Sequence, residues 1–189
     1  MVNADITSRP LPYEGQLQSR MRGDIELVVI HCTELPDLVE AREYGEQIHY
    51  PQSGTGNSGH FYIDRDGRVE QWVDPLQIAH HVANMNRNSI GIELVNQGRY
   101  PSWYDSRHQQ PDEHYPQIQI AALAALLKQL TKTFPNLGQI AGHQDLDTRK
   151  IPSEDDAAIL IQRKIDPGPH FPWQEVLAGT TLQRVNANG

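Results

Sequence analysis

The segment Ile25-Glu-Leu-Val-Val-Ile30 decides the fold class. It is rich in β-branched residues and almost continuously apolar, which predicts a strand buried on both faces. It runs directly into His31-Cys-Thr-Glu34. A polar cluster at the end of a buried strand is where open α/β sheets tend to place their chemistry. Because side chains alternate along a strand, we expect His31 and Thr33 to share one face and Cys32 to take the other.

The remainder of the chain alternates between runs with strand spacing and runs with helical spacing. Asp66-Gly67 between two strand-like runs is a strong hairpin signal. An apolar stripe between Pro116 and Pro135 is the clearest helix. We expect, in order, a strand at 25–30, a helix at 37–49, a hairpin of 60–64 and 68–73, a strand at 90–95, a helix at 116–134, a strand at 140–143, a helix at 153–162 and a weak C-terminal helix. This order predicts a single α/β (α+β) domain with a central mixed β-sheet flanked by helices.

Charge and cysteine content exclude several functions. The 189 residues carry a formal net charge of −8, which disfavours nonspecific binding to nucleic acid or to an anionic membrane. The single cysteine, Cys32, excludes an intramolecular disulfide and a Cys-rich zinc site, so a metal would need His, Asp or Glu ligands. Residues 1–10 lack the apolar core of a signal peptide, and no stretch is apolar enough to span a bilayer. We therefore expect a cytoplasmic protein, or a periplasmic one if an export signal has been trimmed, and no obligate protein partner is evident.

A second informative stretch is Arg163-Lys-Ile-Asp-Pro-Gly-Pro-His-Phe-Pro-Trp173. Its three prolines fix φ and remove backbone donors, so it cannot be a regular helix or a central strand. Lys164 and Asp166 hold opposite charges inside this stiff frame. A rigid charged loop suggests a site, but a surface ion pair before a C-terminal turn explains the same residues equally well.

Three more polar residues emerge from apolar runs. His31 and His143 each close a strand-like run, and Glu93 lies inside one, where a carboxylate without a partner is costly. Two imidazoles and one carboxylate are a common ligand set for catalytic zinc, with the fourth position left for water. A histidine at a strand end is more often hydrogen-bonded and structural. Composition and spacing alone leave both interpretations open.

Five short motifs occur in a fixed order along the chain. They are Val28-Val-Ile-His31 with Thr33, His60-Phe-Tyr-Ile-Asp-Arg-Asp-Gly67, Asn88-Ser-Ile-Gly-Ile-Glu-Leu-Val95, Gly142-His-Gln-Asp145 and Arg163-Lys-Ile-Asp-Pro-Gly-Pro169. Together they resemble the type 2 zinc-dependent N-acetylmuramoyl-L-alanine amidases, whose fold is shared with the peptidoglycan-recognition proteins. The resemblance covers residues 25–177, so it implies an N-terminal arm at 1–24, a zinc amidase domain at 25–177 and a C-terminal tail at 178–189.

The resemblance implies a role for each matching residue. His31, His143 and Asp166 would bind zinc. Glu93 would be the base that activates the attacking water, and Lys164 would stabilise the charged oxygen of the tetrahedral intermediate. Arg149-Lys150 could mimic the lysine motif, but only the pair at 163–164 is followed by Asp-Pro-Gly. The implied reaction is hydrolysis of the amide bond between N-acetylmuramic acid, in its 1,6-anhydro form, and the L-alanine of peptidoglycan stem peptides during cell-wall recycling. The implied partner is a muropeptide or a peptidoglycan fragment.

Four further residues are candidates for substrate binding. His81 matches a histidine of the family, and His80 replaces the tryptophan that usually precedes it. Asn88 opens the motif that contains Glu93. Trp103, in a long polar-aromatic loop, could stack on sugar or peptide, although packing at the rim explains it equally well. Where some members of the family have a tyrosine before the hairpin strand, this chain has Gly59, so no tyrosine role is carried over.

Two rival functions and one departure from the family stay open. A peptidoglycan-recognition module would bind without cutting, although such modules typically lose a metal ligand and all three are present here. A zinc hydrolase acting on a different amide is the other rival, because the motifs define the chemistry better than the substrate. The segment 147–162 is an insert relative to the family, and it could reshape one wall of the substrate groove.

Overall fold

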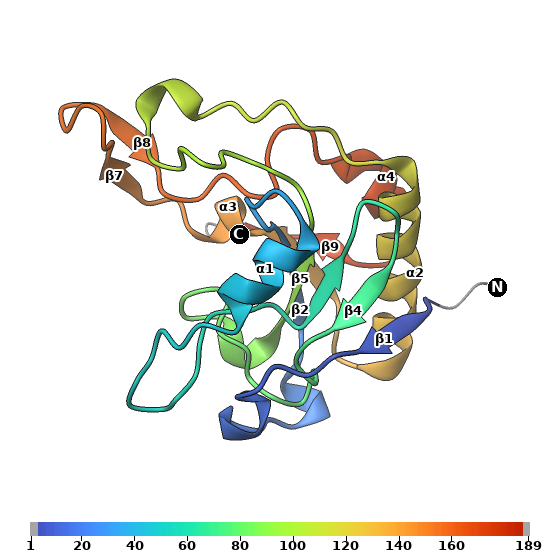
Figure 1. The fold of residues 1–189 in the computed structure, drawn as a ribbon. Helices are drawn as coiled ribbons and strands as arrows, with labels where there is room; N and C mark the ends of the chain where they lie inside the picture. The colour runs from blue at the N-terminus through green and yellow to red at the C-terminus, as the bar shows by residue number, and fades with distance from the viewer. Residues whose placement is uncertain (1–3, 187–189) are drawn as a thin grey trace.

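The computed structural model describes residues 4–186. One mixed sheet of seven strands, in the order β1-β4-β3-β5-β2-β6-β9, runs through it (Figure 1). Strands β3 and β4 are antiparallel, and the other neighbouring strands are parallel. The mixed central sheet predicted from the sequence is therefore confirmed. The strands are β1 Ile6–Ser8, β2 Leu27–Cys32, β3 Phe61–Ile63, β4 Val69–Gln71, β5 Ser89–Leu94, β6 Gln139–Gly142 and β9 Gln183–Arg184.

Strand β2 is the centre of the sheet, with all six of its residues buried. It begins two residues later than predicted and includes His31 and Cys32. The N–H of Ile25 bonds to the carbonyl of Arg22 and closes a 3-10 helix at Arg22–Asp24, so Ile25 precedes the strand. The expected strands at 90–95 and 140–143 each shift by one residue. His143 does not end a strand but begins the short helix α3, His143–Leu146.

The two faces of the sheet are covered by different helices (Figure 1). Helix α2, Gln117–Thr133, packs Ile120, Leu123 and Leu127 against the face that carries Val28 and Ile30 of β2. It follows Pro116, as predicted. On the other face, α1, Leu38–Gly45, packs Leu38 and Ala41 into the cluster around Tyr62 and Trp72.

Helix α1 is shorter than the 37–49 predicted. Asp37 caps its start by accepting hydrogen bonds from the backbone N–H groups of Val39 and Glu40. At the other end, the hydroxyl of Tyr13 donates to the carbonyl of Gly45 at 2.7 Å. This contact satisfies a terminal helix carbonyl from outside the helix, which fits an end at Gly45.

Segments at both ends of the chain join the fold. Strand β1 pairs with β4, and Leu11, Tyr13 and Leu17 are buried in the core cluster that α1 covers. At the C-terminal end, α4, Trp173–Ala178, precedes β9, which pairs with β6. Short 3-10 helices lie at Glu14–Gln16, Asn86–Asn88 and Ser106–His108. Among the described residues, no helix has the length and apolar content needed to cross a membrane.

The helix predicted at 153–162 is wrong. This segment contains the turn and second strand of a two-stranded hairpin, β7 Lys150–Pro152 and β8 Leu160–Gln162, which projects from the body of the protein (Figure 1). Ser153 Oγ donates to the carbonyl of Asp156 and accepts from its N–H, so these two residues close the hairpin turn. The apolar run at 157–160 is exposed and buries no helical face.

Candidate active site

Strand register brings the polar residues of distant motifs into one row. In the sheet, Tyr62 of β3 pairs with Glu93 of β5, and Glu93 pairs with His31 of β2. On the other side of β2, Ile30 pairs with Gly142 of β6, so His143 follows at the level of His31. Because these strands are parallel neighbours, their carboxyl ends meet at one edge. His31 is the penultimate residue of β2, and His143 follows the end of β6 as the first residue of α3, so both lie at this edge although neither closes its strand.

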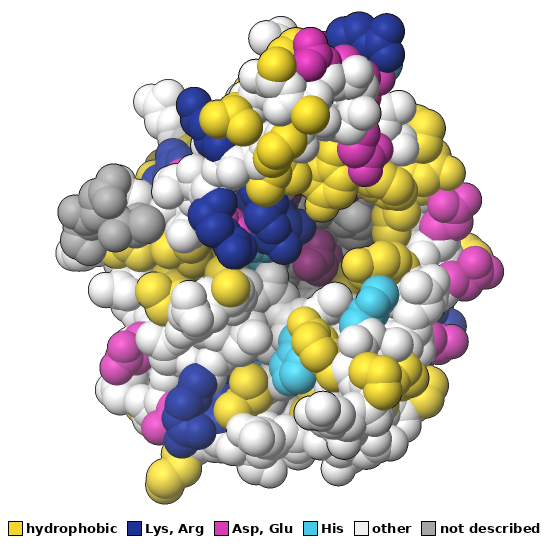
Figure 2. Space-filling model, turned by 90° about the vertical axis from the view of Figure 1, so that its left-hand side faces the viewer, with side chains coloured by type: hydrophobic (Ala, Val, Ile, Leu, Met, Phe, Trp, Pro, Cys, Tyr) yellow, Lys and Arg dark blue, Asp and Glu magenta, His cyan; other side chains and the backbone are white. Residues whose placement is uncertain are grey.

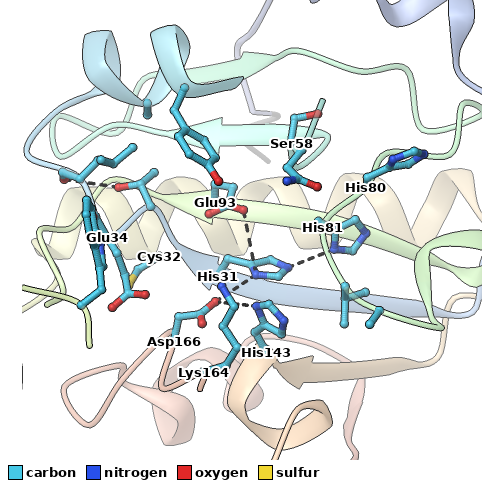
Figure 3. Close-up of a pocket in the computed structure, with 18 of the residues that line it drawn as sticks. His31, Cys32, Glu34, Ser58, His80, His81, Glu93, His143, Lys164 and Asp166 are labelled. Atoms are coloured by element: carbon cyan, nitrogen blue, oxygen red, sulfur yellow. Dashed lines mark hydrogen bonds and ion pairs between the residues drawn. The ribbon is translucent and has the colours of Figure 1, made fainter. Parts of the chain in front are cut away.

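His31, His143 and Asp166 form a buried triad (Figure 3). One potential ligand atom from each residue lies within 4.8 Å of the other two. The Oδ2 atom of Asp166 is 3.0 Å from Nδ1 of His31 and 3.1 Å from Nδ1 of His143. Its Oδ1 atom is buried and has no hydrogen-bond partner. A buried carboxylate oxygen without a partner is costly unless a cation completes the site, so this donor set fits zinc.

Burial sets the charges of the triad. Desolvation lowers the pKa of His31 to about 4, although the neighbouring Asp166 carboxylate acts in the opposite direction. His31 is therefore neutral at pH 7, the state in which imidazole binds a metal. Burial by itself would raise the pKa of Asp166, but its interactions with His143 and, to a lesser degree, His31 outweigh burial and hold that pKa well below its usual range. Asp166 is accordingly ionised, as a metal ligand must be.

The proline-rich loop holds Asp166 from several sides. The backbone N–H of Gln144 donates to the carbonyl of Asp166 at 2.9 Å, and the hydroxyl of Tyr115 donates to the carbonyl of Pro167 at 2.6 Å. Gly142 allows the loop to approach β6, since a Cβ there would lie 2.8 Å from Cδ of Pro167. These contacts make the loop a rigid support for the third residue of the triad.

Glu93 and Lys164 flank the triad with opposite charges (Figure 3). Oε1 of Glu93 lies 4.0 Å from Nδ1 of His31. Burial, and to a lesser degree the charge of Asp166, raises the pKa of Glu93 well above its ordinary value. Burial alone would lower the pKa of Lys164, but the carboxylates of Asp166 and Glu34 raise it, so the amine is protonated. Within residues 4–186 the Lys164 ammonium makes no hydrogen bond or close ion pair, which leaves its donors available.

These residues line a cavity of about 550 Å³. Figure 2 shows it as a hollow with an acidic side chain in its floor, Lys and Arg side chains on one rim and His side chains near the other. Of the four candidates for substrate binding, His80, His81 and Trp103 line the cavity. Asn88 does not, because it lies in the 3-10 helix before β5, at the opposite end of that strand from Glu93. Lys164 lines the cavity, whereas Lys150 is exposed on β7.

Sequence reasoning missed two features of this site. Tyr62, a cavity-lining residue, pairs in register with Glu93, and its hydroxyl accepts a hydrogen bond from the N–H of Gly59. Glu34 and Arg99 form a buried ion pair, with Nε–Oε1 at 2.7 Å and Nη2–Oε2 at 3.0 Å. Strand alternation indicates which face of the sheet the Tyr62 side chain lies on. The sequence of the 99–116 loop, however, contains no signal that Arg99 pairs with Glu34.

The Arg99 side chain also supports the backbone before Lys164. Its guanidinium donates to the carbonyls of Gln162 and Arg163, at 3.2 and 3.3 Å. The Glu34–Arg99 pair therefore connects the end of β2 to the segment that carries Lys164. A planar, five-donor guanidinium suits this geometry, and a lysine would not reproduce it.

Arg99→Met is expected to destabilise the protein by about 3–5 kcal/mol, because it leaves the Glu34 carboxylate buried and unpaired. Urea unfolding measures the change in free energy. The matched control is Arg107→Met, since Arg107 pairs with Asp105 on the surface with a 73% exposed side chain. That loss should be far smaller, because solvent screens an exposed ion pair. Equal effects for the two variants would refute a structural role for the buried pair.

The sequence compares closely with proteins that act on cell walls. A profile described as N-acetylmuramoyl-L-alanine amidase matches residues 21–169. An endolysin of Enterobacteria phage K11 is 30% identical over 156 residues, which cover 82% of this chain and 94% of the endolysin. The protein named 1,6-anhydro-N-acetylmuramyl-L-alanine amidase AmpD, of Haemophilus influenzae, is 27% identical over 181 residues, which cover 82% of each chain.

The fold is shared with solved structures of the same group. The N-acetylmuramyl-L-alanine amidase AmiD of Escherichia coli superposes with a TM-score of 0.60 and 23% identity, covering 82% of this chain and 57% of that one. It was solved in complex with the substrate anhydro-N-acetylmuramic acid-L-Ala-D-gamma-Glu-L-Lys. The fold expected from the sequence resemblance is therefore confirmed.

Proposed function

Because the chain belongs to the N-acetylmuramoyl-L-alanine amidase family, we propose that zinc held by His31, His143 and Asp166 serves its reaction. The protein is an N-acetylmuramoyl-L-alanine amidase that acts on peptidoglycan. The convergence of the three ligand atoms around the unpartnered Oδ1 of Asp166 carries the zinc assignment. Zinc in such a site polarises a carbonyl and brings the pKa of water to about 7.

In this proposal Glu93 and Lys164, two charged residues of the cavity, have different roles in the reaction. Glu93 takes the proton of the attacking water and passes it to the leaving amine of alanine. Burial raises the pKa of Glu93 well above its ordinary value, which makes its carboxylate a stronger base than one in water. The protonated amine of Lys164 donates to the carbonyl oxygen of the substrate as negative charge develops there. Two observations support these roles. The ammonium of Lys164 has free donors, and Oε1 of Glu93 lies 4.0 Å from Nδ1 of His31, close to the triad without being part of it.

We propose the 1,6-anhydro muropeptide as the preferred substrate and cytoplasmic recycling as the role. The similarity to the Haemophilus influenzae relative, whose name states that sugar, supports the proposal. The similarity to the phage endolysin favours a second candidate, intact peptidoglycan. Cell fractionation tests the location.

A comparison of three substrates tests the sugar form: 1,6-anhydro-N-acetylmuramyl tripeptide, its reducing counterpart and insoluble peptidoglycan. Release of stem peptide is measured for each. We expect kcat/KM to be highest for the anhydro form. A higher value for insoluble peptidoglycan would overturn the recycling role but leave the amidase intact. Binding of muropeptide without any release, in zinc-loaded protein, would instead favour the recognition module.

A further inference from the structure

The ring of His31 makes one contact on each of its two nitrogens. Nδ1 faces Asp166 at 3.0 Å, and Nε2 lies 3.0 Å from Nδ1 of His81 (Figure 3). Nε2 of His81 lies 3.2 Å from Oγ of Ser89, which is 2.7 Å from the carbonyl oxygen of Met85. These contacts form a continuous chain that leads away from the triad. The zinc assignment does not use it.

The last contact of this series, between Ser89 and Met85, determines where each proton lies. The carbonyl of Met85 can only accept, so its 2.7 Å contact requires the single hydroxyl proton of Ser89. Ser89 Oγ must then accept from Nε2–H of His81. No described carboxylate contacts the His81 ring to hold a second proton on it, so with its one proton on Nε2 its Nδ1 carries a lone pair. That lone pair accepts Nε2–H of His31, which leaves the lone pair of His31 on Nδ1, facing Asp166.

Either direction leaves one contact without a proton. The direction above leaves the 3.0 Å contact between Nδ1 of His31 and Oδ2 of Asp166, which a metal ion held by both residues would fill, whereas the reverse direction leaves a contact that nothing fills. The reverse direction would need Ser89 to donate to His81, His81 to donate to His31, and His31 to donate to Asp166 from Nδ1. Two oxygens, Ser89 Oγ and the Met85 carbonyl, would then lie 2.7 Å apart with no proton between them. It would also place a proton on the nitrogen of His31 that faces the triad, where a metal requires a lone pair.

The surrounding backbone accommodates the His81 ring. Ser89, Gly91 and Glu93 alternate along β5 and face the same side of the sheet as His31. A Cβ at Gly91 would lie 2.6 Å from Cγ of His81, so only glycine leaves room for the ring. The side chain of Asn86 accepts from the backbone N–H groups of His81 and Val82, at 3.0 and 2.8 Å. His81 is thus held in place without any substrate.

We propose that His81 and Ser89 are positioning residues for the zinc site. They fix the tautomer and the ring orientation of His31, so that Nδ1 presents its lone pair to the metal. This inference rests on the proposed zinc function. It gives His81 a role other than the substrate contact expected from the sequence. Partners that orient a ligating histidine in this way are typically worth about 10–100-fold in metal affinity.

The test compares zinc dissociation constants, measured by competition with a chelator. His81→Leu removes the acceptor for His31 and should weaken zinc binding by about 10–100-fold. His81→Gln offers a carbonyl to His31 and an N–H to Ser89, so it should recover most of the affinity. Ser89→Ala should fall between these variants. The matched control is His49→Leu, which should bind zinc like the parent protein, because His49 is exposed, lies against Tyr44 and does not line the cavity.

Wild-type affinity in His81→Leu would overturn the proposal, as would equal losses in the Leu and Gln variants, because the ring would then act by packing alone. A second readout is the tautomer of His81 in the zinc-loaded protein, from long-range proton–nitrogen NMR correlations. We expect the proton on Nε2, and a proton on Nδ1 would overturn the proposal. Failure of the parent protein itself to bind zinc would instead reject the proposed function.

Discussion

Replacing Asp166 with alanine is expected to abolish tight zinc binding and, with it, amidase activity. Asp166 supplies the only carboxylate of the buried triad, and its Oδ1 has no other partner in residues 4–186. Two histidines alone do not complete the three-ligand set of a catalytic zinc site. The loss in affinity should exceed the roughly 10–100-fold that follows removal of an orienting partner. Metal content after dialysis against a chelator, and release of stem peptide, measure the two effects.

Two further measurements separate ligand loss from misfolding. Metal-free Asp166→Ala should still unfold cooperatively in urea, but it should be less stable than the metal-free parent, because the lowered pKa of Asp166 shows that its contacts stabilise the folded protein. Asp166→Cys should recover zinc binding, since a thiolate is also a zinc ligand. An Asp166→Ala protein that keeps one zinc per chain and full activity would contradict the assignment of the triad.

Elements with a strong local pattern could be predicted from the sequence. The apolar run that became β2, the Asp-Gly hairpin and the stripe of α2 each carry their own signal. The segment 153–162 could not be predicted, because its apolar residues fit a helix only if something covers them. In the fold Ile159 and Leu160 stay exposed, and backbone pairing of β7 with β8 takes the place of side-chain burial. The local sequence pattern does not show whether strand pairing or helical side-chain burial will determine the structure of this segment.

Prediction of the candidate site from the sequence would have required the order of the strands in the sheet. The motifs implied roles for His31, Glu93 and His143, but their convergence follows from the strand order β5-β2-β6. Spacing along the chain does not contain that order. The His81 contact with His31 is set by the irregular segment before β5, which has no periodic pattern. A role for His81 in orienting a ligand therefore required the structure, although the sequence already indicated that it belongs to the site.

Glu93→Gln is expected to lower kcat by about 10²–10⁴-fold while zinc binding changes little. The amide has nearly the same shape but cannot take a proton from water, and general-base catalysis is typically worth that factor. Glu93 is not part of the triad, and its Oε1 atom lies 4.0 Å from Nδ1 of His31. Since burial raises the cost of ionising Glu93, the neutral amide should leave the fold as stable as before. Steady-state kinetics, zinc content and urea unfolding of the same preparation measure the three quantities.

Lys164→Met is the matched companion of this variant. It retains the length of the side chain but removes the donor expected at the substrate oxygen, so kcat should fall by about 10²–10³-fold with zinc retained. If both residues act in the same transition state, the double variant should lose less than the product of the two single losses. Glu93→Gln with undiminished kcat would refute its role as the base. A loss of zinc in either variant would show instead that its charge supports the metal site, because neither side chain belongs to the triad.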